Sequence, residues 1–182
     1  IIDKITSGEI RIPSFQRGFV WEEDDVAFFI DSLYKGYPIG AVLFWRTKER
    51  LLNERNLGHF LLPEPTKDYP VDYVLDGQQR LTSIFSVFQT ELTSMDDPDW
   101  KDIYYMIGSG IKSQDVQFIP LEKEDVDLKR HFPIRTLFDS VEYRKATENL
   151  DDNEKTEIDK LQETFKEISI PIQLMETDDK SI

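Results

Sequence analysis

Residues 71–82 read Val71-Asp72-Tyr73-Val74-Leu75-Asp76-Gly77-Gln78-Gln79-Arg80-Leu81-Thr82, and their hydrophobic period changes at Gly77. Before the glycine, Val71, Tyr73 and Leu75 alternate with their neighbours as residues of a strand do. After it, apolar residues recur at the spacing of a helix, at Leu81, Ile84, Phe85, Phe88 and Leu92. The stretch predicts a strand that passes directly into a helix over residues 78–92, with polar residues at the junction.

The start of this helix is a candidate phosphate site. Its first N–H groups lack partners within the helix, and the helix dipole places positive charge there. Arg80 would lie in the first turn, where a guanidinium can donate two parallel hydrogen bonds to a phosphate. Asp76 can orient Arg80, hold a cation or cap the helix. A purely structural interpretation stays open, because Asp-Gly is a common turn and Gln-Gln-Arg are good helix formers.

A second candidate site is the loop after Pro13, which reads Ser14-Phe15-Gln16-Arg17-Gly18-Phe19-Val20-Trp21. Gln16 and Arg17 offer an amide and a guanidinium for hydrogen bonding. Phe15 and Trp21 flank them with aromatic rings, which can stack on a nucleobase or pack in the core.

The composition bounds the class of protein. A chain of 182 residues is long enough for one domain, which we expect over residues 1–175 with a motif core (1–92) and an acidic part (93–175). Residues 176–182 read as a polar tail. The chain contains no cysteine, which excludes disulfides, thiolate metal sites and a cysteine nucleophile. With neither a spanning apolar run nor a signal pattern, we expect a cytoplasmic protein. Because it begins without methionine, we expect a fragment of a longer one.

The net charge of −14 is concentrated in the second half, where residues 91–182 carry 23 acidic and 12 basic side chains. Such a surface repels DNA phosphates, so we expect DNA to be bound only through a more complete protein. A local basic patch around Arg46, Lys48, Arg50 and Arg55 is the alternative, although a solvated strand end explains those charges too.

Hydrophobic patterns elsewhere predict a mixture of strands and helices. We expect a helix ending near Ser7, helices over 22–34 and 151–168, strands over 9–12, 41–45, 103–107, 116–121 and 170–175, an extended segment over 133–138, and at most a short strand over 59–62. Asp96, Asp97 and Asp99 suggest a metal loop, but their spacing lacks the glycine and glutamate of a calcium loop. Strands and helices that mix without strict alternation indicate an α+β domain, a mixed sheet with flanking helices.

Two motifs together resemble a known family. Ile12-Pro13-Ser14-Phe15-Gln16-Arg17 with Trp21 downstream, followed by Asp76-Gly77-Gln78-Gln79-Arg80-Leu81-Thr82, is similar to the N-terminal domain of GmrSD-type modification-dependent restriction endonucleases, within a wider ParB and sulfiredoxin-like group. The resemblance covers residues 1–92 well and residues 93–175 only by general pattern.

The resemblance implies a domain that binds and hydrolyses a nucleoside triphosphate (ATP, GTP, CTP or UTP) with Mg²⁺, coupled to restriction of phage DNA. The nucleotide would contact Gln16, Arg17, Asp76, Gly77, Gln78, Gln79, Arg80 and Thr82, with Asp76 and Arg80 as catalytic residues and Asp76 as a weak metal ligand. The family continues into a nuclease domain, which we expect as a missing partner domain or subunit, and a homo-oligomer is open. Two histidines cannot supply a His-Asn-His nuclease motif, so we expect no DNA cleavage by this chain.

Two other functions compete with nucleotide binding. A ParB-like nuclease would need several clustered carboxylates, and the candidate site offers Asp72 and Asp76. A non-catalytic module that recognises modified DNA is disfavoured by the acidic second half.

Overall fold

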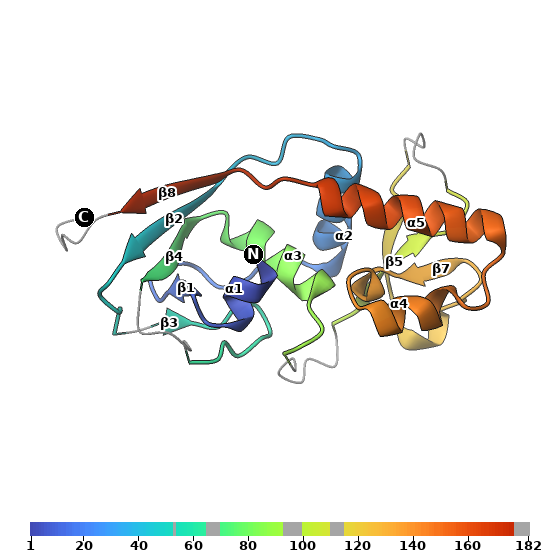
Figure 1. Ribbon diagram of the computed structural model, residues 1–182. Coiled ribbons are helices and arrows are strands. Elements are labelled where there is room, and N and C mark those ends of the chain that lie inside the picture. The colour runs from blue at the N-terminus through green and yellow to red at the C-terminus, as the bar shows by residue number, and fades with distance from the viewer. Residues whose placement is uncertain (53, 65–69, 93–99, 110–114, 177–182) are drawn as a thin grey trace. The chain divides into compact units, whose positions relative to one another are not determined.

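The computed structural model describes residues 1–52, 54–64, 70–92, 100–109 and 115–176, which separate into two compact units (Figure 1). The first unit comprises Ile1–Val20, Gly40–Asp97 and Ile170–Ile182, and the second comprises Trp21–Ile39 and Pro98–Ser169. Each unit therefore combines segments that are separated in the sequence, and the division does not fall at a single point near residue 92. The single domain over residues 1–175 stays a prediction.

The first unit is built on a five-stranded mixed sheet. Its strands are β1 (Ile10–Pro13), β2 (Val42–Thr47), β3 (Glu54–Arg55), β4 (Val71–Asp76) and β8 (Ile172–Glu176), in the order β3-β1-β4-β2-β8. β4 is parallel to β1 and antiparallel to β2, while β8 runs parallel to β2 at the edge. The expected mixed sheet is confirmed.

Two helices belong to this sheet, α1 (Ile2–Thr6) and α3 (Gln78–Phe88). Figure 1 shows β4, in green, turning directly into α3, as the change of period predicts. The helix ends at Phe88 rather than at residue 92, because Gln89 adopts an extended backbone and its side chain bonds to Leu92. A buried cluster joins sheet and helix, formed by Ile5, Ile10, Ile12, Val42, Phe44, Leu57, Phe60, Leu62, Val74, Leu81 and Phe85.

The excursion between β2 and β4 contains β3 and one isolated bridge between Leu57 and Phe60. The short strand considered over 59–62 does not form, because Phe60 and Leu62 are buried in the core without a strand partner. The alternating hydrophobic pattern at Phe60 and Leu62 therefore indicates buried side chains and not a strand of the sheet.

The second unit combines a three-stranded antiparallel sheet with three α-helices. The strands β5 (Asp102–Met106), β6 (Phe118–Leu121) and β7 (His131–Pro133) lie in the order β6-β5-β7. The helices are α2 (Glu23–Tyr34), α4 (Ser140–Thr147) and α5 (Asp152–Glu167). The strands expected over residues 103–107 and 116–121 form β5 and β6, and they pair antiparallel. The extended segment expected over 133–138 is wrong beyond Pro133, since Ile134–Thr136 forms a 3₁₀ turn.

Aromatic packing holds the second unit together. The rings of Tyr34, Tyr105, Phe118 and Phe165 have centroids within 6.0 Å of one another in five pairs. The acids at the start of α2 have a structural role, because the Asp25 carboxylate accepts the backbone N–H of Glu22. Among the described residues, no helix is long and apolar enough to cross a membrane. The expected metal loop at Asp96, Asp97 and Asp99 lies outside the described residues.

Candidate functional site

The junction between β4 and α3 turns on Gly77. Asp76 is the last residue of β4, and Gly77 is the N-cap of α3 with φ of 88°, in the left-handed region. A Cβ there would lie 3.1 Å from Nη2 of Arg80 and 3.3 Å from the Cα of Val42, so glycine is required by both conformation and space. Asp76 is therefore not the cap, and the N-cap glycine makes no side-chain bond to the first turn of α3. A helix start of this kind is a place where backbone N–H groups can bind an anion.

Arg80 lies over this turn, against two glycines. Its Nη2 is 3.0 Å from Oδ2 of Asp76, so Asp76 orients the guanidinium. A Cβ on Gly40 would lie only 2.8 Å from Nη1 of Arg80. The Arg80 side chain is 19% exposed and that of Asp76 is 73% exposed, so the pair is open to solvent mainly at the carboxylate. The sequence did not identify Gly40 as a site residue, since a glycine in this segment indicates no more than a turn. Its φ of 75° lies in the left-handed region, which favours glycine at this position.

The loop of residues 14–20 is fastened to the same junction. Nε2 of Gln16 donates to the carbonyl of Leu75 at 2.8 Å. The Gln79 amide accepts the N–H of Val20 at 2.9 Å and donates to the carbonyl of Gly18 at 3.0 Å. The two sequence motifs, 59 residues apart, are thus brought together as the shared site predicts.

The two aromatic candidates have different surroundings. Phe15 is 67% exposed in the first unit, on the same loop as the exposed Arg17. Trp21 belongs to the second unit, where its ring meets Phe29 edge-on at 5.4 Å. Base stacking by either ring stays a prediction, and the contact with Phe29 gives Trp21 a packing role of its own.

A stripe of unused hydrogen-bonding groups runs along α3. Gln78, Thr82 and Ser86 follow at four-residue intervals, which places them on one helix face. The Gln78 amide and the hydroxyls of Thr82 and Ser86 are buried without a hydrogen-bond partner in the described part of the chain. An unsatisfied buried polar group costs about 1–3 kcal/mol. A ligand that paired with these groups would recover that energy.

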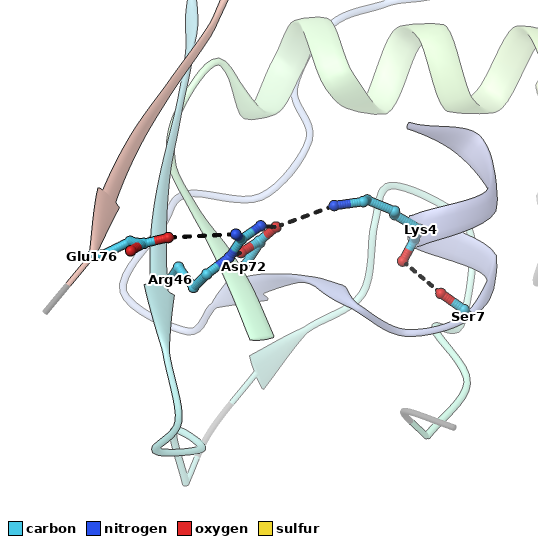
Figure 2. Close-up of polar contacts among 5 residues, drawn as sticks. All are labelled: Lys4, Ser7, Arg46, Asp72 and Glu176. Atoms are coloured by element: carbon cyan, nitrogen blue, oxygen red, sulfur yellow. Dashed lines mark hydrogen bonds and ion pairs between the residues drawn. The ribbon is translucent and has the colours of Figure 1, made fainter. Parts of the chain in front are cut away.

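The second carboxylate near the junction, Asp72, is engaged elsewhere. Asp72 is 6% exposed, and its two oxygens accept from Nε and Nη2 of Arg46 at 2.7 and 2.9 Å (Figure 2). Lys4 lies 3.8 Å from the same carboxylate, and Glu176 on β8 lies 3.5 Å from Arg46. The hydrogen bond with Asp72 is the main reason that the pKa of Arg46 is raised above its ordinary value. This network joins α1, β2, β4 and β8, so it has a structural explanation.

The local basic patch considered around Arg46 and Arg50 is largely neutralised. Arg46 pairs with Asp72, and Nη2 of Arg50 lies 2.7 Å from Oε2 of Glu64. The hydrogen bond from Arg50 lowers the pKa of Glu64 below its ordinary value. Lys48 is exposed, and the side chain of Arg55 lies outside the description. These residues fit the interpretation as a solvated strand end.

Comparisons with known proteins agree with the two motifs. The model of the GmrSD restriction endonuclease N-terminal domain matches residues 1–182. An uncharacterized protein of Methanocaldococcus jannaschii is 36% identical over 94 residues, which are 47% of this chain and 15% of that relative. The chain thus matches a small part of a much longer relative. Because the family model covers the whole chain, the protein belongs to the family of GmrSD restriction endonuclease N-terminal domains.

Proposed function

We propose that the first unit binds a nucleoside triphosphate with Mg²⁺ at the start of α3, as the regulatory and NTP-hydrolysing part of a modification-dependent DNA restriction system. One observation carries the proposal: two polar motifs far apart in sequence meet where an uncapped helix begins. Family membership supports the link to restriction. The nuclease would reside in another domain or subunit.

Phosphate capture follows from the helix start. The N–H groups after Gly77 and the positive end of the α3 dipole favour an anion. Arg80, held by Asp76 against Gly40, adds a planar pair of donors. Arg17 is exposed on the adjoining loop and supplies a second positive charge. Charge neutralisation of this kind is the main contribution that proteins make to phosphoryl transfer.

A bound Mg²⁺ would supply positive charge against the phosphates of the nucleotide. The residue that would hold it is Asp76, whose carboxylate is 73% exposed at the end of β4. A single carboxylate fits this ion, because Mg²⁺ at nucleotide sites is commonly held by one or two carboxylates together with phosphates and waters.

The buried stripe on α3 supports a polar ligand rather than DNA cleavage. Gln78 and Thr82 offer donors and acceptors beside the helix start. A nuclease site would instead need carboxylates gathered around one metal. Asp72 is paired with Arg46, and no group of three potential metal-binding residues occurs in the part of the chain that was described.

Calorimetric titration of the chain with ATP, GTP, CTP and UTP, each with Mg²⁺, tests the proposal, followed by a phosphate-release assay. We expect binding of at least one nucleotide. Arg80→Ala should weaken that binding roughly 10- to 150-fold, since a charged hydrogen bond contributes about 1.5–3 kcal/mol. Arg80→Lys should recover only part of the loss, because an ammonium lacks the planar fork.

The control is Arg144→Ala, which removes an exposed arginine on α4 whose Nε bonds locally to the carbonyl of Ser140. It removes one positive charge, as Arg80→Ala does, and should leave nucleotide affinity unchanged. Equal affinity of the parent and a folded Arg80→Ala protein, or no binding of any nucleotide by the parent, would contradict the proposal.

A further inference from the structure

We infer that Gln79 is a positioning residue, which fixes the loop carrying Arg17 and acts on the nucleotide through Arg17 instead of touching it. This inference rests on the function proposed above. It departs from the expectation that the Gln79 side chain is itself a nucleotide contact.

Both ends of the Gln79 amide are already used inside the protein. Its Oε1 accepts the N–H of Val20 and its Nε2 donates to the carbonyl of Gly18. The loop thus presents one donor and one acceptor to Gln79. The uncharged amide of glutamine suits this pair, because its oxygen accepts and its nitrogen donates. Gln79 is 9% exposed, and both bonds are partly buried. The amide keeps one further lone pair and one further N–H, but the burial of Gln79 leaves a nucleotide little access to them.

Hydrogen bonds hold the loop on both sides of Arg17. On one side of it, Gln16 bonds to the carbonyl of Leu75, the residue before Asp76. On the other side, Gly18 and Val20 bond to Gln79, the residue before Arg80. The backbone is thus anchored on either side of Arg17, while the Arg17 side chain remains exposed. Anchoring a loop in advance reduces the entropy that its charged side chain loses on binding a ligand.

The same argument separates Gln79 from its neighbour. Gln78 is equally buried, but both polar atoms of its amide lack a partner in the described residues. Of the two adjacent glutamines, Gln78 therefore has both ends of its amide unused in the described residues, whereas Gln79 uses one acceptor and one donor to hold the loop. Substitutions at the two positions should affect binding in different ways.

A double-mutant cycle between Gln79→Met and Arg17→Ala tests the inference. Methionine keeps the length and helix propensity of glutamine but removes both hydrogen bonds. We expect Gln79→Met to weaken nucleotide binding about 5- to 30-fold in the parent, and by less than about twofold when Arg17 is already alanine. A loss of the same size in both backgrounds would show direct contact or general damage and would overturn the inference.

Hydrogen exchange of the Val20 amide measures its hydrogen bond to Gln79 in the absence of any ligand. Exchange should be faster in Gln79→Met and intermediate in Gln79→Glu, which keeps the acceptor for Val20 but faces the Gly18 carbonyl with a second oxygen. Unchanged exchange in both variants would overturn the inference even if nucleotide binds.

Gln162→Met is the matched control, because Nε2 of Gln162 likewise anchors a backbone carbonyl, that of Leu137 in the second unit. It should change neither nucleotide affinity nor exchange at Val20. A parent that binds no nucleotide overturns the proposed function and the role given to Arg17, whereas the exchange experiment still decides whether Gln79 holds the loop.

Discussion

Gly40→Ala tests the placement of Arg80 from the opposite side of the contact. Gly40 has φ of 75°, where an alanine costs about 1–2 kcal/mol. Its new Cβ would lie 2.8 Å from Nη1 of Arg80, closer than such contacts occur. Because that atom ends a flexible side chain, the guanidinium will move in preference to the backbone. The variant should therefore fold, with Arg80 displaced from its position beside Asp76.

Two effects of different size follow. For a chain of 182 residues, 1–2 kcal/mol corresponds to a fall in melting temperature of about 2–8 °C. Displacing Arg80 removes one or both of its charged hydrogen bonds to the phosphate, so nucleotide affinity should fall about tenfold or more. Calorimetric titration and thermal unfolding of the same preparations measure both.

Gly36→Ala is the control that separates backbone strain from the contact with Arg80. Gly36 has φ of 72°, and nothing lies within 4 Å of a Cβ built on it. It should lose a similar amount of stability and keep the nucleotide affinity of the parent. If the two variants bind nucleotide equally well, Arg80 is not held in a ligand-binding position by Gly40, and the reasoning fails.

Other predictions concern stability, pH and DNA. Asp72→Asn should cost about 2 kcal/mol in urea unfolding, less than the roughly 3–5 kcal/mol for breaking a fully buried pair, because Arg46 is 30% exposed. Glu64→Gln, at an exposed pair, should barely move the midpoint. Burial, and then its hydrogen bond to Glu157, raises the pKa of Tyr105 above its ordinary value, so the folded state keeps this phenol protonated when the unfolded state releases it. Stability should therefore fall as pH rises above about 10, and less steeply in Tyr105→Phe, as alkaline unfolding curves can show. DNA binding measured by fluorescence anisotropy should be weak and disappear at about 150 mM salt, and tight binding there would show that a basic surface dominates the net charge.

The junction could be predicted because local rules decide it. A change of period marks where β4 becomes α3, and a glycine is needed wherever the backbone turns with positive φ. The same rules expected Asp76 as one possible cap, whereas the structure ends β4 on Asp76 and leaves its side chain to Arg80. Strand pairing was harder to predict from the sequence. Phe60 and Leu62 alternate with polar or exposed residues because they are buried, although their segment forms only an isolated bridge and no strand.

The role of Gln79 could not be predicted from side-chain patterns. Its partners are backbone groups of Gly18 and Val20, which carry no sequence signature and lie some sixty residues away. The contact between Gly40 and Arg80 is hidden for the same reason, since a turn glycine reveals its conformation and not its neighbour. Tertiary contacts to the backbone thus decide which of two adjacent glutamines is free.

The distribution of charge is compatible with the proposed phosphate site in so acidic a chain. The segments of the second unit contain 22 acidic and 12 basic residues, and those of the first unit contain 14 and 10. Within the first unit, Asp72 is neutralised by Arg46 and Lys4, and Glu64 by Arg50. Screening over about 8 Å at physiological salt makes the nearest charges decisive. At the start of α3 these are Arg80 and Asp76, together with the helix dipole. The local charge at this turn is therefore compatible with the proposed binding of a compact polyphosphate, although the chain as a whole is acidic.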